Sequence, residues 1–198
     1  MDMAIPWTKD WNELPREPFR VERIDGVDYV QMGAPGLNHS TMIFNMADVF
    51  RQHFNEKKCQ FYSNVAVHLF NDDNFVVPDM LILCDLSKIR NNKIFGPPDL
   101  IAEVLSPSNA NHDKKIKMKT YAKAGVKEYW LVESRRRTVE VYVLQDEHYT
   151  LDHIYYVLED WEFNDFRPDE QEKFRFKIHS PAFPDMSIET TEIFKNLT

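Results

Sequence analysis

Glycine, cysteine and basic residues are all scarce in this chain of 198 residues. Five glycines exclude a collagen-like or glycine-rich architecture. The 24 basic residues are outnumbered by 32 acidic ones, which gives a formal net charge of −8. Because the overall field of such a protein repels a polyanion, a function on nucleic acid would need a locally basic surface or a bridging metal ion.

Cysteines and long apolar runs are also nearly absent. Cys59 and Cys84 stand in hydrophobic segments and form no CxxC pair, so we expect two buried free thiols rather than a disulfide or a zinc site. The longest apolar stretch runs from Phe75 to Cys84 and is interrupted by Pro78 and Asp79. A membrane helix needs about 20 apolar residues. Since no signal-peptide pattern is visible either, we expect a cytoplasmic protein.

The apolar material that is present suffices for a hydrophobic core. Hydrophobic residues make up 43% of the chain and charged residues 28%, a balance typical of a folded globular domain. No internal repeat or low-complexity linker divides the sequence. We therefore expect an irregular N-terminal arm over residues 1–18 and a single domain over residues 19–198.

Hydrophobic periodicity indicates strands before and after a long helix, and a second helix between later strands. Residues 19–32 alternate around Asp25-Gly26, a dipeptide favoured in tight hairpin turns. The other expected elements are a helix over 37–54, strands over 59–70, 75–85 and 99–105, a loop and helix over 106–125, a hairpin over 126–145 and two strands in the tail. This order predicts an α/β or α+β domain built around one sheet.

Two acidic residues interrupt segments that otherwise read as buried strands. Asp79 lies within FVVPDMLIL, and Glu103 lies within LIAEVL. A buried carboxylate is costly unless it is paired or coordinates a cation. Adjacent strands could bring the two side chains together, and converging carboxylates need a shared proton or a divalent cation between them.

The helix after the second of these strands supplies a lysine aimed at the sheet. At about 100° per residue, Lys115, Lys119 and Lys123 form one stripe, which we expect to face solvent. Lys117 projects about 160° away from that stripe, on the side shared with Tyr121. We expect Tyr121 itself to be a core aromatic residue. Lys117 is thus the lysine of this helix that points most clearly inward.

An inward lysine near two carboxylates is typical of metal-assisted phosphodiester hydrolysis. Mg²⁺ is commonly held by one or two carboxylates together with waters and phosphate oxygens. The ammonium group can position a water and stabilise the charge that grows on the phosphate. A basic window over residues 114–137 would favour contact with a nucleic acid backbone. The candidate contact residues there are Lys114, Lys115, Arg135, Arg136 and Arg137.

Several further motifs stand out in combination. They are Pro78-Asp79, the EVLSPS string from Glu103, Asp113-x3-Lys117-x3-Tyr121, the GVKEYW string from Gly125, the ERIDG string from Glu22, His39, and the FPDMSI string from Phe183. Together these motifs resemble the Uma-two family of restriction endonucleases, which belongs to the PD-(D/E)XK nuclease superfamily. The similarity spans roughly residues 19 to 195.

The resemblance implies a restriction-endonuclease-like core, namely a central mixed β-sheet flanked by helices. It also implies Mg²⁺, with Mn²⁺ as a substitute, and DNA as the substrate. Asp79 and Glu103 take the places of the two metal-binding acids. The superfamily usually has a lysine two positions after the second acid, where this chain has Leu105. In this family the lysine lies on the following helix, and Lys117 matches that position. Members of the superfamily often pair so that each strand of the DNA meets one active site, which further implies a homodimer.

Glu22 and His39 are auxiliary candidates for the site. The simpler interpretations are that Glu22 is a hairpin residue and that His39 is a helix cap or a surface residue.

Two other functions remain open from the residues alone. One is a catalytically silent binding module that keeps the fold, which the acidic net charge and the displaced lysine both favour. The other is a hydrolase that uses paired carboxylates without metal, such as a glycosidase.

Overall fold

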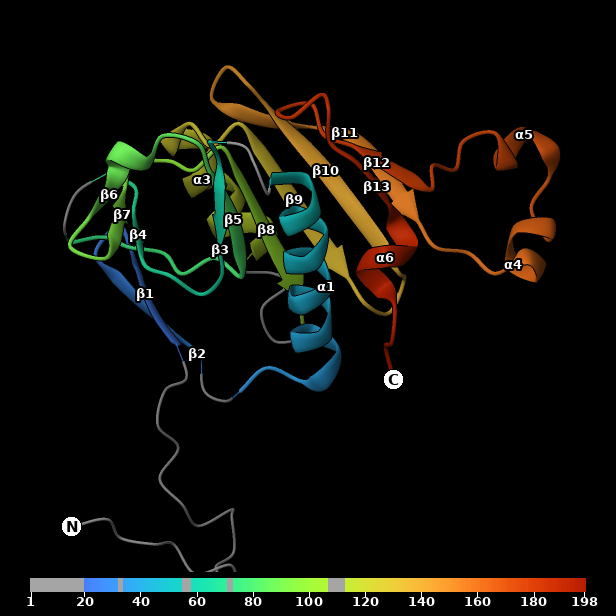
Figure 1. The fold of residues 1–198 in the computed structure, drawn as a ribbon, viewed down its shortest axis with the longest axis horizontal. Coiled ribbons are helices and arrows are strands. Elements are labelled where there is room, and N and C mark those ends of the chain that lie inside the picture. The colour runs from blue at the N-terminus through green and yellow to red at the C-terminus, as the bar shows by residue number, and fades with distance from the viewer. Residues whose placement is uncertain (1–19, 32–33, 55–57, 71–72, 107–112) are drawn as a thin grey trace, which may run out of the picture.

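A computed structural model describes residues 20–31, 34–54, 58–70, 73–106 and 113–198, and for residues 113 and 114 the backbone only. The expected arm over residues 1–18 lies outside this range. The described residues form a mixed sheet with helices on both faces (Figure 1). This architecture confirms the expected fold class. No helix among the described residues is both long and apolar enough to cross a membrane.

Six strands form the central sheet, in the order β11-β10-β9-β8-β5-β3. Strands β8 and β9 are parallel, whereas every other neighbouring pair in this sheet is antiparallel. The parallel pair requires a crossover, and the helical segment between its strands provides it. The strands are β3 (Gln60–Tyr62), β5 (Met80–Leu83), β8 (Leu100–Leu105), β9 (Glu128–Glu133), β10 (Thr138–Gln145) and β11 (His148–Tyr156).

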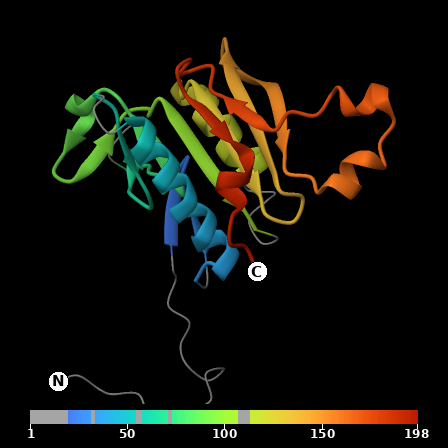
Figure 2. The same ribbon diagram turned by 45° about the vertical axis from the view of Figure 1, so that its right-hand side comes forward.

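One face of the sheet is covered by α1 (Leu37–Phe54), α6 (Thr190–Phe194) and the hairpin of β12 (Lys177–His179) and β13 (Ser187–Glu189). Figure 2 shows α1 and α6 on the same side of the sheet. Even-numbered residues of β8, such as Ala102, pack in this core with Phe50 of α1. The buried methionine and phenylalanine side chains of α1 pack against this face of the sheet; they are Met42, Met46, Phe50 and Phe54.

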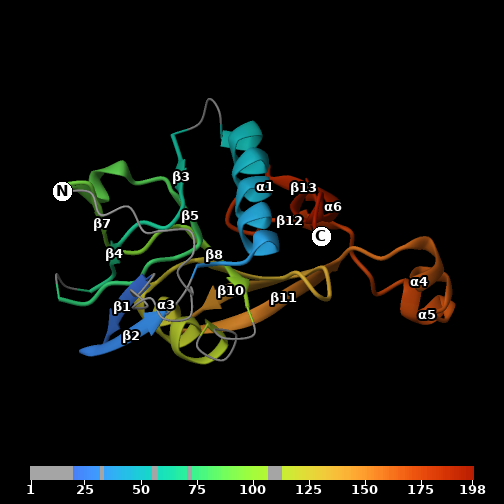
Figure 3. The same cartoon turned by 90° about the horizontal axis from the view of Figure 1, so that it is seen from below.

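The opposite face is covered by the crossover helix and by the N-terminal hairpin, as the view from below shows (Figure 3). The crossover consists of the π-helical turn η3 (Asp113–Lys117) followed by α3 (Met118–Ala124). Odd-numbered residues of β8, such as Ile101, face this second core, which also contains Tyr121. Because side chains alternate along a strand, Glu103 faces α3 rather than α1.

The N-terminal hairpin pairs β1 (Arg20–Ile24) with β2 (Val27–Gln31), as predicted. Asp25 and Gly26 have φ values of 50° and 77°, the two positive values that a type I′ turn requires.

The remaining elements lie outside the central sheet. A three-stranded sheet consists of β4 (Val67–His68), β6 (Ile89–Arg90) and β7 (Lys93–Phe95), and η2 (Leu86–Lys88) is a 3₁₀ turn. The short helices α4 (Asp160–Asn164) and α5 (Pro168–Gln171) project from the body (Figure 1).

The predicted helix over residues 37–54 is confirmed with its ends unchanged, and the hairpin of β9 and β10 is also confirmed. The tail contains three described strands, β11, β12 and β13, where two were predicted. Two predicted strands are shorter than expected. The segment 59–70 bends at Asn64, whose φ is 54°, and divides into β3 and β4 in different sheets. The segment 75–85 is a regular strand only from Met80, because Pro78 has no N–H to give to a neighbouring strand.

Cys59 and Cys84 form a disulfide, so the expectation of two free thiols was wrong. The two residues lie one step beyond the Gln60–Leu83 pair of strands β3 and β5, and are therefore direct cross-strand neighbours. Both side chains are only half-buried. The spacing of the cysteines in the sequence could not reveal the pair, because it depends on the register between two strands.

Reduction of this disulfide is expected to lower the melting temperature. The two cysteines are 25 residues apart, and closing a loop of that size stabilises a protein by about 3 kcal/mol. For a chain of this length the loss corresponds to a decrease of roughly 6–12 °C. Thermal unfolding followed by circular dichroism, with and without dithiothreitol, measures it. A Cys59→Ser/Cys84→Ser variant should not respond to the reductant. Two titratable thiols in the untreated protein would contradict the disulfide.

Candidate active site

Asp79 and Glu103 come together at one end of the central sheet. Met80 of β5 pairs with Ala102 of β8, so Asp79, one residue earlier, stands opposite Glu103. The backbone N–H of Asp79 donates to Glu103 Oε2 at 3.3 Å. The two residues are 1% and 0% exposed. The two carboxylates that the sequence singled out are thus neighbours on the buried face toward α3.

Lys117 reaches the same place from the last residue of the π-helical turn. Its Nζ lies 3.0 Å from Glu103 Oε1 and 3.0 Å from Glu22 Oε1. Tyr121, one helical turn later, donates from its hydroxyl to the same Glu103 oxygen at 2.7 Å. Lys117 is 2% exposed, so its predicted inward direction is confirmed. π-helical turns are frequent at functional sites.

Asp79 is held by an arginine, a histidine and a backbone amide. Arg20 donates from Nη2 to Oδ1 at 2.8 Å, and the N–H of Val104 donates to Oδ2 at 2.9 Å. His39 Nε2 lies 3.1 Å from Oδ2. Burial by itself raises the pKa of Asp79, but the His39 contact and the charges of Arg20 and Lys117 outweigh it. The pKa of Asp79 is therefore well below its usual range, and the group is ionised at neutral pH.

Arg20 was missed by sequence reasoning, and Tyr121 was assigned only to the core. The ring of Tyr121 does pack in the core, with its centroid 5.3 Å from that of Tyr129. Burial, followed by the charges of Glu103 and Glu22, raises the pKa of Tyr121 well above its usual value, so its hydroxyl remains a donor. Helical spacing four residues after Lys117 could have indicated this second role. The pairing of Arg20 depends on the placement of β1, which the sequence does not define.

Three carboxyl groups, an arginine and a lysine are concentrated in this cluster, which comprises Arg20, Glu22, His39, Asp79, Glu103, Lys117 and Tyr121. In the described part of the chain, no three His, Cys, Asp or Glu side chains are arranged to hold a metal ion by themselves. Two converging carboxylates nevertheless match the donor set that Mg²⁺ prefers, since it usually completes its shell with waters and substrate phosphate. Asp79 and Glu103 are therefore the residues that could hold Mg²⁺.

The lysines on the outer side of the crossover face solvent, as predicted. Lys115, Lys119 and Lys123 are exposed. The side chain of Lys114 lies outside what the structure describes. Lys115 is only two residues from Lys117 and thus close along the chain to the carboxylate cluster. This face adds positive charge near the candidate site.

The basic turn between β9 and β10 lies at the same end of the sheet as the cluster. Leu105, the last residue of β8, pairs with Glu133, the last residue of β9, immediately before the turn. Arg135 and Arg136 are exposed there. Arg137 instead pairs at 2.8 and 2.9 Å with two glutamates on or beside α4, Glu159 and Glu162. Arg135 and Arg136 thus remain exposed, with Arg136 Nε 3.9 Å from Glu133 Oε2.

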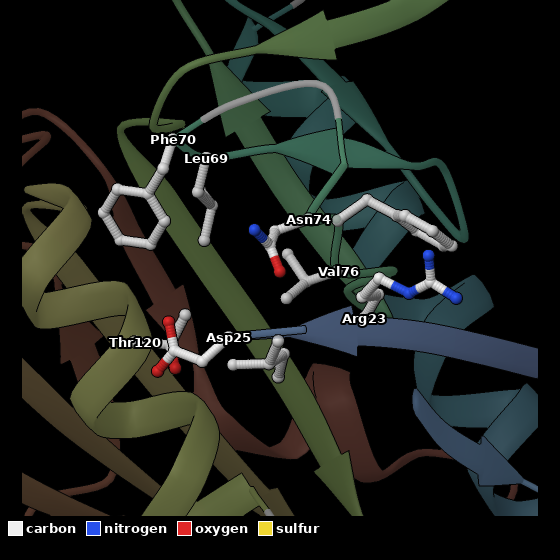
Figure 4. Close-up of a pocket in the computed structure, with 9 residues that line it drawn as sticks. Arg23, Asp25, Leu69, Phe70, Asn74, Val76 and Thr120 are labelled. Atoms are coloured by element: carbon white, nitrogen blue, oxygen red, sulfur yellow. The ribbon is translucent and has the colours of Figure 1, made fainter. Parts of the chain in front are cut away.

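Two hollows on the surface are lined by residues outside the cluster. A small one of about 210 Å³, including its open mouth, borders the β1–β2 turn and α3, with Asp25, Asn74 and Thr120 in its wall (Figure 4). An open groove runs between β11 and the segment that precedes β13. Neither contains Asp79, Glu103 or Lys117. The convergence of charged groups, rather than a cavity, identifies the candidate site.

Comparison with known proteins identifies similar chains. The sequence model of the Uma2 family, described as "Putative restriction endonuclease", matches residues 8–172. The uncharacterized protein slr1290 of Synechocystis sp. is 30% identical over 139 residues, which cover 69% of this chain and 72% of that protein. The uncharacterized protein sll1609 of the same organism is 25% identical over 135 residues, 65% of this chain and 76% of the relative.

A solved structure has a similar fold. It is the crystal structure of a protein from Anabaena variabilis described as a putative nuclease belonging to DUF820. The TM-score is 0.66, and the alignment covers 92% of this chain and 94% of that one. The sequence identity is 19%, so this likeness concerns the fold alone.

Proposed function

This chain belongs to the Uma2 family, and from that premise we propose that it is a metal-dependent endonuclease that hydrolyses phosphodiester bonds in DNA. The observation that carries the proposal is the convergence of Asp79, Glu103 and Lys117 in one buried cluster. These are the residue types that such hydrolysis needs, and they come from two adjacent strands and the following helix. A buried cluster of this kind is expensive to maintain without a function.

Each group has a distinct task in the proposed reaction. Asp79 and Glu103 would hold Mg²⁺, for which Mn²⁺ would substitute. The bound ion would lower the pKa of a water molecule and polarise a phosphate oxygen. Lys117 Nζ, held at 3.0 Å from Glu103 Oε1, would orient the attacking water and stabilise the negative charge that develops on the phosphate. The low pKa of Asp79 keeps this carboxylate ionised.

DNA is the proposed substrate, and the exposed side chains of Lys115, Arg135 and Arg136 are the proposed contacts with its phosphates. Arg137 is a weaker candidate because two glutamates already hold it. A homodimer would present two such sites to the two strands of a duplex. The cytoplasmic location stays a prediction, and the disulfide argues against a strongly reducing compartment.

Purified protein is expected to nick or cut plasmid DNA when Mg²⁺ or Mn²⁺ is added and to leave it intact in the presence of a chelator. Gel electrophoresis of supercoiled plasmid measures both outcomes. Calorimetric titration with Mn²⁺ provides a second readout. If the protein does not cleave DNA and shows no Mn²⁺ binding that depends on Glu103, it is instead a catalytically silent member of the family that keeps the fold. Cleavage that persists in the chelator would contradict the metal requirement.

A further inference from the structure

Strand β1 directs two charged side chains into the cluster. Arg20, Glu22 and Ile24 share one face of the strand and are 9%, 5% and 5% exposed. Arg23, on the opposite face, pairs with Asp28 at the surface. The strand thus directs Arg20 and Glu22 toward the site and Arg23 toward solvent.

Both buried side chains bind the backbone of Val77, two residues before Asp79. Glu22 Oε1 accepts from the Val77 N–H at 2.7 Å, and Arg20 Nη1 donates to the Val77 carbonyl at 2.8 Å. Pro78, which follows, has no N–H to contribute. Side chains of β1 therefore hold both backbone polar groups of Val77, whereas the carbonyl of Pro78 accepts from the backbone N–H of Asn64 at 3.1 Å.

Each of these side chains also holds one group of the proposed reaction. Arg20 Nη2 donates to Asp79 Oδ1 at 2.8 Å and to Asn64 Oδ1 at 2.6 Å. Glu22 Oε1 lies 3.0 Å from Lys117 Nζ, so Lys117 is shared between Glu22 and Glu103. The planar guanidinium binds Asp79, Asn64 and Val77 at once through two separate nitrogens, whereas an ammonium group has all its donors on a single nitrogen.

We propose that Arg20 and Glu22 are positioning residues of the active site, with Arg20 fixing Asp79 and Glu22 fixing the ammonium group of Lys117. The proposal rests on the proposed nuclease function. It makes the N-terminal hairpin a part of the catalytic machinery. Groups that orient metal ligands or catalytic side chains through hydrogen bonds, without touching the metal or substrate, commonly contribute about 10- to 100-fold to activity or metal affinity.

Attachment of the hairpin alone does not account for these contacts. The backbone of Arg23 exchanges two hydrogen bonds of 2.9 Å with Phe75, and Ile24 lies in the core beneath the hairpin. Buried ion pairs add little net stability compared with apolar residues of similar size. Two charged side chains that converge on Asp79 and Lys117 are therefore better explained by the geometry they impose on those groups.

Glu22→Gln is the first test, with Asp28→Asn as the matched control on the exposed side of the same hairpin. We expect Glu22→Gln to lower kcat for plasmid cleavage by about 10- to 100-fold while KM changes little. Glu22→Asp, which keeps the charge but shortens the side chain, should show a smaller loss of kcat. Asp28→Asn should match the parent protein.

Chemical acetylation of lysines, followed by mass spectrometry, reports the position of Lys117 without any activity. In the parent protein Lys117 should resist acetic anhydride under conditions that modify Lys119, which is exposed. Glu22→Gln should raise the labelling of Lys117 about tenfold or more, as expected for loss of an orienting contact. Asp28→Asn should leave it unchanged.

Arg20→Lys tests the other contact, with Arg23→Lys as its control. Because lysine keeps the charge but not the fork of donors, we expect kcat to fall by about tenfold or more. Arg23→Lys should have no effect. Unchanged kcat in both Arg20→Lys and Glu22→Gln, with Lys117 still protected, would overturn the inference while leaving the nuclease function intact. If the parent protein cuts no DNA, the proposed function fails instead, and the labelling alone decides whether Glu22 holds Lys117.

Discussion

Replacing Glu103 with Gln is expected to lower the rate of Mg²⁺-dependent DNA cleavage by on the order of 1000-fold or more. The substitution keeps the size of the side chain but removes the charge of one of two proposed metal ligands. Its Oε1 also accepts hydrogen bonds from Lys117 and Tyr121, so the change disturbs the ammonium group as well. Initial rates of plasmid nicking over a range of Mg²⁺ concentrations measure the effect.

The matched control for this change is Glu192→Gln, an exposed glutamate on α6 that pairs with Lys195. It should cut DNA like the parent protein. Circular dichroism of Glu103→Gln should show the parent's secondary structure, because Glu22 still faces Lys117. Parental activity in a folded Glu103→Gln protein would refute the assignment of the site.

Replacing Lys117 with Met is expected to lower both activity and stability. Loss of the ammonium group should cost about 100- to 1000-fold in cleavage rate, the range for removal of one group that stabilises a developing negative charge. It also leaves Glu22 and Glu103 buried without the cation between them, which should reduce the free energy of unfolding by about 3–5 kcal/mol. Urea denaturation and plasmid cleavage measure the two effects separately.

Added Mn²⁺ should stabilise Lys117→Met more than it stabilises the parent protein. The metal binds only the folded protein, and the variant offers it carboxylates that no ammonium group neutralises. Lys119→Met, on the exposed face of the same helix, is the control and should change neither stability nor cleavage appreciably. Equal stability of Lys117→Met and the parent would show that Lys117 does not neutralise the buried carboxylates.

Much of the fold was predictable because local patterns determine it. Helix α1 has a continuous apolar face, and its ends agree with the prediction. The β1–β2 hairpin follows from Asp25-Gly26, whose positive φ values match the turn type. The division of residues 59–70 between two sheets was not predictable, since it arises from a bend at Asn64 and from pairing with distant strands.

The central residues of the candidate site were predictable for a different reason. A charge in an apolar strand or on the inner face of a helix conflicts with its surroundings, and that conflict singled out Asp79, Glu103 and Lys117. Arg20 gave no such signal, because an arginine near the end of a surface hairpin is ordinary. Its contact with Asp79 spans 59 residues of sequence and depends on tertiary packing.

Strand register explains the wrong prediction for the cysteines. Whether Cys59 faces Cys84 depends on a one-residue choice in the pairing of β3 with β5, and a shift by one residue would separate them. The same dependence applies to Asp79 and Glu103, which are neighbours because Met80 pairs with Ala102. The sequence supplied a reason for the two carboxylates to converge but none for the two thiols.

Diffraction from crystals soaked in Mn²⁺, recorded at the manganese absorption edge, tests the proposed site most directly. We predict one or more anomalous peaks bonded to carboxylate oxygens of both Asp79 and Glu103, with Lys117 Nζ nearby and no peak there in Glu103→Gln crystals. A well-ordered cluster without a peak, or manganese bound only elsewhere, would contradict the metal-dependent mechanism.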